Sequence, residues 1–140
     1  MKKEIYDKLF TAALKAHGNA YCPYSKFPVG AALLTSDGNI YSGTNVEDAG
    51  VVAIHAEQGA IMQMVAAQGA SHITHMVIVG GKPDDGMACS PCGHCRQTMV
   101  EFADDSTEIT SAGPKGDIRL ETTLGSLVPY PFRLRNVLKA

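Results

Sequence analysis

The sequence has little of what marks a membrane protein or a nucleic-acid-binding protein. No apolar run approaches the length of a membrane span, and the start, Met1-Lys2-Lys3-Glu4-Ile5, lacks the apolar core of a signal peptide. Lysine and arginine do not cluster, and the net charge is −2, which disfavours binding to a long nucleic acid. We expect a cytoplasmic protein that binds neither membranes nor nucleic acid polymers.

The chain is long enough for one compact domain and too short for two. It has 140 residues, of which 45% are hydrophobic and 19% are charged, and this composition supports a real core. No repeat or low-complexity segment interrupts it. We therefore interpret residues 1–140 as a single domain.

Cysteine is scarce, but three of the four cysteines lie close together. Cys89, Cys92 and Cys95 follow one another closely, and Cys22 stands apart. Without an export signal, such a cluster is more typical of metal binding or catalysis than of disulfide bonds. A Cys-x-x-Cys pair by itself could also be a redox pair or half of a structural zinc site.

Cys92 and Cys95 lie at the start of a predicted helix. Ser90 followed by Pro91 is a helix-start signal, and the helix should run to about Phe102. The spacing lets both sulfurs reach one metal ion. Because the positive end of the helix dipole favours anions, we expect both cysteines to ionise more easily than free thiols. Thiolates are ligands that zinc prefers.

His55-Ala56-Glu57 supplies a third possible metal ligand and an acidic side chain, both of which the cysteine pair lacks. These residues lie in the first turn of a second predicted helix, over residues 54–68. His55 can add a nitrogen ligand, and three protein ligands leave the fourth tetrahedral position open, as in catalytic zinc sites. Glu57 could lie beside that position without binding the metal, where a proton shuttle must be. A lone histidine here would more often belong to the core, but the downstream cysteines favour a ligand.

The remaining segments predict an α/β fold. Apolar spacing indicates a first helix over residues 3–16, and Asp37-Gly38 joins two strands, 29–35 and 39–46, into a hairpin. Further strands are predicted at 75–80, 107–112 and 118–122. Because strands and helices alternate after the hairpin, we expect a five-stranded mixed sheet with helices on both faces. The two metal-bearing helices should begin at the same edge of this sheet.

Side by side, these segments resemble the cytidine deaminases, in particular their short, homotetrameric type. His-x-Glu followed by Pro-Cys-x-x-Cys is a known signature of zinc-dependent nucleobase deaminases. The resemblance covers nearly the whole chain and rests on five segments in the family's order. These are Pro23–Ala32, Asn45-Val46-Glu47, His55-Ala56-Glu57, Pro91–Gln97 and Leu127–Phe132.

The resemblance implies a three-layer cytidine-deaminase-like fold, a homotetramer and one Zn²⁺ per subunit. It also implies hydrolytic deamination of cytidine and deoxycytidine in pyrimidine salvage, by zinc-activated hydroxide with Glu57 as the proton shuttle. The implied zinc ligands are His55, Cys92 and Cys95. The implied substrate contacts are Phe27 on the pyrimidine ring, Asn45-Val46-Glu47 at the sugar, with Asn45 and Glu47 on its hydroxyls, the Ala56 backbone on the base edge, and Phe132 reaching a neighbouring subunit's pocket.

Two places depart from the short-chain pattern. Short members of the family commonly have cysteine in place of His55 and arginine in place of Gln58. Zinc with three thiolates carries a formal charge of −1, which an arginine can offset. One histidine and two thiolates make the site neutral, so an uncharged Gln58 suffices. Asp48–Val51 replaces a typical Ala-Ala-Tyr segment, which favours an altered or broader range of nucleosides.

Two alternatives stay open at this point. A related zinc deaminase could act on another amino-heterocycle, such as a nucleoside antibiotic, a free base or a nucleotide, although a carboxylate at Glu47 would repel phosphate. A non-catalytic zinc module could instead use Cys89, Cys92, Cys95 and one histidine, His94 or His55, as a closed site. That arrangement would leave Glu57 without a role. The residues alone assign no role to Cys89, His94 or Arg96.

Overall fold

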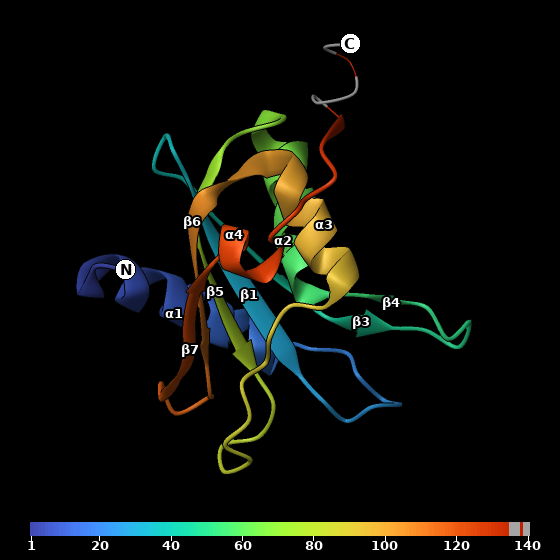
Figure 1. The fold of residues 1–140 in the computed structure, drawn as a ribbon. Helices are drawn as coiled ribbons and strands as arrows, with labels where there is room; N and C mark the ends of the chain where they lie inside the picture. Colours follow the sequence, from blue (N-terminus) through green and yellow to red (C-terminus); the bar gives the residue numbers. More distant parts are fainter. Residues whose placement is uncertain (135–137, 139–140) are drawn as a thin grey trace.

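The computed structural model describes residues 1–134 and 138 (Figure 1). Its elements, in order, are α1 (Lys3–Gly18), β1 (Val29–Thr35), β2 (Ile40–Thr44), β3 (Val46–Glu47), β4 (Ala53–Ile54), α2 (Ala56–Gln68), β5 (Ile73–Gly80), α3 (Gly93–Phe102), β6 (Ala103–Ala112), β7 (Ile118–Thr123) and α4 (Leu124–Leu127). Among the described residues, no helix is both long enough and apolar enough to span a membrane.

The central sheet has five strands in the order β2-β1-β5-β6-β7. β5 and β6 are parallel and are joined by a crossover through α3, whereas the β1–β2, β1–β5 and β6–β7 pairs are antiparallel. The predicted Asp37-Gly38 hairpin is confirmed, because Gly38 has a φ of 89° and Leu34 pairs with Ile40. The sheet is therefore mixed, as the alternation of strands and helices predicted.

Side chains of the two central strands alternate between two cores. Successive strand residues point to opposite faces, so a strand covered on both sides has to be apolar throughout. The core under α2 and α3 includes Ala31, Leu33, Met76 and Ile78. The core under α1 includes Leu9, Ala13, Ala32, Val77 and Val79. The predicted three layers, with helices on both faces of the sheet, are thus confirmed (Figure 1).

Two glycines let helices lie unusually close to the sheet. A Cβ atom at Gly30 would lie 2.0 Å from the carbonyl oxygen of Ala13 in α1. A Cβ atom at Gly43 would lie 2.2 Å from the backbone nitrogen of Ala60 in α2. Only glycine fits at such distances. Gly43 therefore sets how closely α2, whose first turn carries Glu57, approaches β2.

Several predicted boundaries differ from the structure. The strand expected over residues 39–46 ends at Thr44, and residues 46–47 instead pair with residues 53–54 in a separate hairpin that was not predicted. β6 begins at Ala103 and not at the predicted residue 107. The prediction missed this start because residues 104–106 are exposed and polar and so carry no core pattern. β5 begins at Ile73, two residues before the predicted start.

Candidate active site

The predicted metal ligands lie where α2 and α3 begin. Both helices start later than predicted, so His55 and Cys92 are N-cap residues with extended backbone instead of members of the first turn. This conformation is the ordinary one for a residue that precedes a helix. Cys95 follows in the first turn of α3, and its N–H donates to Cys92 Sγ at 3.4 Å. The starts of α2 and α3 therefore orient all three side chains.

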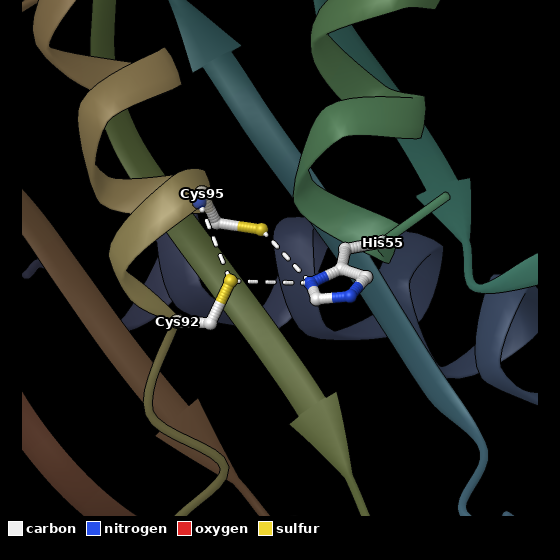
Figure 2. A group of neighbouring side chains, drawn as sticks. All are labelled: His55, Cys92 and Cys95. Atoms are coloured by element: carbon white, nitrogen blue, oxygen red, sulfur yellow. Dashed lines mark hydrogen bonds between the residues drawn. The ribbon is translucent and has the colours of Figure 1, made fainter. Parts of the chain in front are cut away.

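These three side chains converge on one point (Figure 2). His55 Nδ1 lies 3.2 Å from Cys92 Sγ and 3.4 Å from Cys95 Sγ, and the three ligand atoms lie within 4.8 Å of one another. Within the described part of the chain, no other group of histidine, cysteine or acidic side chains meets this criterion, so Cys89 and His94 do not join it. One nitrogen and two sulfurs fit a tetrahedral zinc ion with one open position.

Burial opposes the predicted easy ionisation of Cys95. Cys95 is fully buried, and this burial raises the pKa of its thiol, which the Glu57 carboxylate raises further. Loss of hydration outweighs the helix dipole here. A metal cation in the site reverses this balance, because a coordinating thiol is deprotonated. Metal binding should therefore release protons.

Glu57 lies in the first turn of α2 and is only 4% exposed. Its burial raises the pKa of the carboxyl group, while its own backbone N–H, His55 and Cys95 act in the opposite direction. A buried carboxyl group with a raised pKa binds a proton more readily than an ordinary one, which suits a group that accepts and releases protons during a reaction. Glu57 is thus suited to moving protons beside the metal ligands.

A cavity of about 310 Å³ opens beside these residues. This volume is that of a pocket for a small organic molecule. Among the predicted substrate contacts, Phe27, Asn45, Glu47 and Ala56 line it. His55, Cys92 and Glu57 also line it, so two of the three predicted metal ligands share one space with four of the predicted binding residues.

Asn45 and Glu47 also hold the loop that carries Phe27. Asn45 Oδ1 accepts the N–H of Val29 at 2.9 Å, and Nδ2 donates to the Phe27 carbonyl oxygen at 2.9 Å. The two oxygens of Glu47 accept the N–H of Ser25 at 3.2 and 3.3 Å. An amide group has a second N–H, and a carboxylate has further lone pairs. Both side chains therefore keep hydrogen-bonding capacity for a ligand.

Other residues expected near the substrate lie outside this cavity. Val46 is 42% exposed on β3, and Phe132 is 66% exposed in the chain that follows α4. Gln97 Nε2 donates to the Phe132 carbonyl oxygen at 2.9 Å, which holds this segment beside α3 and leaves the ring accessible. Asp48–Val51 forms the tip of the β3–β4 hairpin, which extends beyond the sheet (Figure 1). A role of Phe132 in a neighbouring subunit stays a prediction.

Cys89 and Ser90 line the cavity, although the sequence interpretation gave neither of them a role there. Burial, followed by the charges of Glu57 and Asp85, raises the pKa of Cys89 to about 12, so this thiol is neutral. Both residues lie within three positions before Cys92. Proximity in sequence to a metal ligand was the signal that could have identified them.

Arg96 holds this part of the wall in place. Its Nη2 donates to Ser90 Oγ at 2.9 Å, its Nε donates to the Pro91 carbonyl oxygen at 2.7 Å, and its Nη1 donates to the Leu127 carbonyl oxygen at 3.1 Å. Because a guanidinium group presents its donors in a rigid plane, these bonds fix the turn that leads into Cys92. Arg96 connects the start of α3 to α4.

Gln58 lies between the starts of the two helices. Its Oε1 accepts the N–H of His55 at 3.2 Å, and its Nε2 lies 3.3 Å from the ring nitrogens of His94. The uncharged amide therefore supports the backbone of one metal ligand directly. An arginine at this position could not accept that N–H, because its side chain has no acceptor.

Residues 3–110 match the family model described as the cytidine and deoxycytidylate deaminase zinc-binding region. The chain belongs to this deaminase family. It is 38% identical over 126 residues to the cytidine deaminase of Sporosarcina psychrophila, covering 90% of each chain. The zinc-binding region and the His55, Cys92 and Cys95 group together identify Zn²⁺ as the cofactor.

Solved structures of the family have the same fold. The cytidine deaminase of Burkholderia pseudomallei has a TM-score of 0.81 and 35% identity, over 94% of this chain and 100% of that one. The cytidine deaminase of Mycobacterium tuberculosis has a TM-score of 0.75 and 30% identity, over 91% and 97% of the two chains. The predicted resemblance to short cytidine deaminases is thereby confirmed.

Proposed function

We propose that the protein deaminates cytidine and deoxycytidine hydrolytically, which yields uridine and deoxyuridine and releases ammonia. The observation that carries this proposal is the convergence of the His55, Cys92 and Cys95 group with buried Glu57 on one cavity of about 310 Å³. Relatives named cytidine deaminase, at 38% and 33% identity, support the same reaction.

In this proposal, His55 Nδ1 and the sulfurs of Cys92 and Cys95 hold one zinc ion per subunit. When bound, zinc supplies a Lewis acid that lets a water molecule lose a proton near neutral pH. The donor set suits this use, since one imidazole and two thiolates leave a position for water. His55 and Cys92 keep access to solvent, whereas Cys95 is buried, so the site is open on one side.

Glu57 moves the protons. Its carboxylate accepts a proton from the attacking water and delivers it to the pyrimidine nitrogen N3 while the oxygen adds to C4. Glu57 then carries the second proton of that water to the amino group, which leaves as ammonia. Protons and electron pairs balance, because the water supplies one oxygen and both protons. The low exposure of Glu57 keeps bulk water away from these transfers.

The other cavity residues bind and orient the nucleoside. Phe27 packs against the pyrimidine ring, and the backbone of Ala56, at the first position of α2, offers an N–H without a partner inside the helix to the base edge. Asn45 and Glu47 meet the sugar, with the second Asn45 N–H and the Glu47 oxygens on its hydroxyls. The Glu47 charge disfavours a phosphate there, so a nucleoside is favoured over a nucleotide.

We further propose that residues 1–140 act as a single deaminase domain within a homotetramer, in the cytoplasm and in pyrimidine salvage. Tyr130 and Phe132 are 97% and 66% exposed, and aromatic side chains so exposed are suited to a subunit interface. Phe132 would then reach a neighbouring subunit's cavity. Free thiols and thiolate ligands suit a reducing compartment.

The loss of cytidine ultraviolet absorbance with zinc-loaded protein tests the reaction. Glu57→Gln should retain zinc and lose about 10²- to 10⁴-fold in turnover, the usual contribution of a general acid–base group. Glu101→Gln, an exposed position on α3, is the matched control and should remain fully active. Turnover by Glu57→Gln within tenfold of the wild type would refute the assignment of Glu57.

A substrate panel separates the proposal from the alternatives. Cytidine, deoxycytidine, ring-substituted cytidines, cytosine and cytidine monophosphate should be compared under the same conditions. Activity on the two nucleosides with little on the monophosphate would support the proposal. Activity on a free base or a nucleotide alone would favour the other amino-heterocycle deaminases. Analytical ultracentrifugation measures the subunit number independently.

A further inference from the structure

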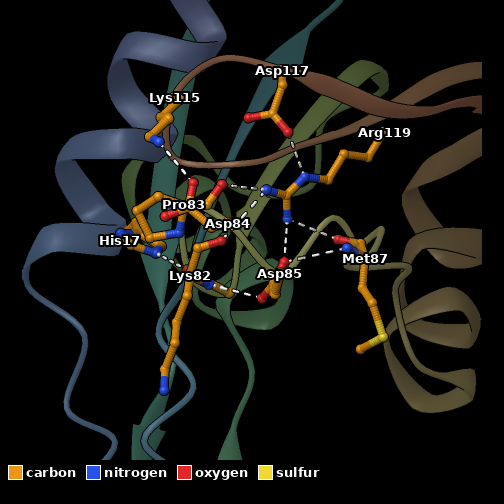
Figure 3. A network of polar contacts seen from close by, with 10 residues as sticks. His17, Lys82, Pro83, Asp84, Asp85, Met87, Lys115, Asp117 and Arg119 are labelled. Carbon is orange, nitrogen blue, oxygen red and sulfur yellow. Dashed lines mark hydrogen bonds and ion pairs between the residues drawn. The ribbon is translucent and has the colours of Figure 1, made fainter.

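Arg119 lies outside the cavity but holds the loop that leads to one of its walls (Figure 3). This loop, residues 81–88, connects the end of β5 to Cys89. The side chain of Arg119 extends from β7 and is only 5% exposed. A buried guanidinium group needs hydrogen-bond and ion-pair partners, because burying a charge without them is costly.

Every N–H of the Arg119 guanidinium group has a partner. Nε donates to the Asp117 carboxylate at 2.7 Å, and the other four bonds all reach the loop. These are the bonds from Nη1 to the Asp85 carboxylate at 2.6 Å and the Met87 carbonyl at 2.9 Å, and from Nη2 to the carbonyls of Lys82 at 3.4 Å and Pro83 at 3.2 Å. Because the donors form a rigid planar fork, one side chain determines the conformation of the loop.

Asp85 secures the same loop from within. Its carboxylate accepts the N–H of Lys82 at 2.9 Å and the N–H of Met87 at 3.3 Å. Gly81, with a φ of 76°, lies against it. A Cβ atom at Gly81 would lie 2.3 Å from Asp85 Oδ2 and 3.2 Å from Cε2 of Phe27. The loop therefore lies directly against Phe27, which lines the cavity.

The loop also continues into the cavity wall. Cys89 packs on the end of β5 so closely that a Cβ atom at Gly80 would lie 2.4 Å from its sulfur. Beyond Cys89, Arg96 holds Ser90 and Pro91. Arg119 and Arg96 thus fix the two ends of the segment that carries Cys89, and only Arg96 lies next to the metal ligands.

We propose that Arg119 is a positioning residue for nucleoside binding, which acts by fixing the 81–88 loop against Phe27 and behind Cys89. This inference rests on the proposed function, because it concerns the cavity assigned to the nucleoside. None of the hydrogen-bond partners of Arg119 is a metal ligand or Glu57. Its loss should therefore weaken binding more than the chemical step.

Steady-state kinetics of Arg119→Met and Arg119→Lys test this inference. We expect KM for cytidine to rise at least about tenfold, which corresponds to about 1.4 kcal/mol, while kcat stays within about twofold. Arg119→Lys should show the same change, because an ammonium group cannot reach five acceptors in one plane. Lys115→Met is the matched control: Lys115 pairs with Asp84 of the same loop at 2.8 Å, but both groups are exposed, so KM should not change.

A second measurement needs no substrate. The alkylation rate of Cys89 by iodoacetamide in the zinc-loaded protein, measured by mass spectrometry with Cys22 as the internal reference, should rise several-fold in both Arg119 variants and not in Lys115→Met. If Arg119→Met does not fold, Arg119→Lys carries the test. Unchanged KM and unchanged Cys89 labelling in a folded variant would overturn the inference. A lowered thermal midpoint without a change in KM or in Cys89 labelling would overturn it as well. If the wild type leaves cytidine unchanged, the proposed function fails, and the labelling still decides whether Arg119 fixes the loop.

Discussion

Replacing Gly43 with alanine should disturb both the stability of the protein and its active site. The new Cβ atom would lie 2.2 Å from the backbone nitrogen of Ala60 and 2.6 Å from the carbonyl oxygen of Ala56. Ordinary carbon contacts need about 3.5 Å or more, so α2 has to move away from β2 by about 1 Å. The atoms that collide are backbone atoms, which no side-chain rotation can relieve.

The magnitude follows from this displacement. Overpacking of a core contact costs about 1–3 kcal/mol, and each kcal/mol lowers the thermal midpoint of a chain of this size by about 2–4 °C. We therefore expect a loss of about 2–12 °C. Because α2 carries Glu57 in its first turn, a shift of about 1 Å should also lower kcat by up to about 100-fold.

Gly18→Ala is the matched control for Gly43→Ala. Gly18 ends α1, and a Cβ atom there would meet no atom within 4 Å. We expect this variant to be as stable as the wild type or slightly more stable, since alanine favours the helix. Thermal unfolding by circular dichroism and cytidine turnover should be measured for both. A midpoint within about 2 °C of the control, with unchanged kcat, would refute the argument that backbone contact fixes α2.

Three further predictions concern the metal site and the loop. Cys95→Ser should lower zinc affinity by at least about 100-fold in competition with a chromophoric chelator, since a buried hydroxyl replaces a thiolate; equal affinity would remove Cys95 from the ligands. Gln58→Arg should weaken zinc binding about tenfold in the wild type but strengthen it in His55→Cys, where the site carries a negative charge; the same sign in both backgrounds would contradict the charge argument. The N–H of Lys82, followed by that of Met87 and by Arg119, lowers the pKa of Asp85, so its stabilising contribution exists at neutral pH and is lost as Asp85 becomes protonated in acid. The difference in thermal midpoint between the wild type and Asp85→Asn should therefore shrink as the pH falls below the ordinary aspartate range, and a constant difference would contradict this.

The secondary structure was largely predictable because its signals are local. The Asp37-Gly38 turn and the apolar strand before Gly80 each depend on neighbouring residues, and both occur as expected. The β3–β4 hairpin was missed because two paired residues on each side carry no period that a pattern can reveal. The start of β6 was missed because residues 104–106 are exposed and lie at a register shift, between the pairing of Ala103 with Ile73 and that of Glu108 with His75.

The sequence by itself determined the ligand types and the proton shuttle candidate. His55-Ala56-Glu57 and Cys92-Gly93-His94-Cys95 combine defined chemistry with defined spacing, and the helix starts that aim them are encoded locally. Spacing along the chain is sufficient for this, because an N-cap residue and the first helical turn have a fixed geometry.

Only the tertiary structure decided which other residues serve the cavity. Cys89 lines it because Gly80 has no side chain, and Arg119 supports it from β7 through bonds to a loop more than thirty residues earlier. The burial that raises the pKa values of Glu57 and Cys95 also exists only after the helices pack on the sheet. Such long-range contacts depend on the order and direction of the strands, and no local pattern of residues records them.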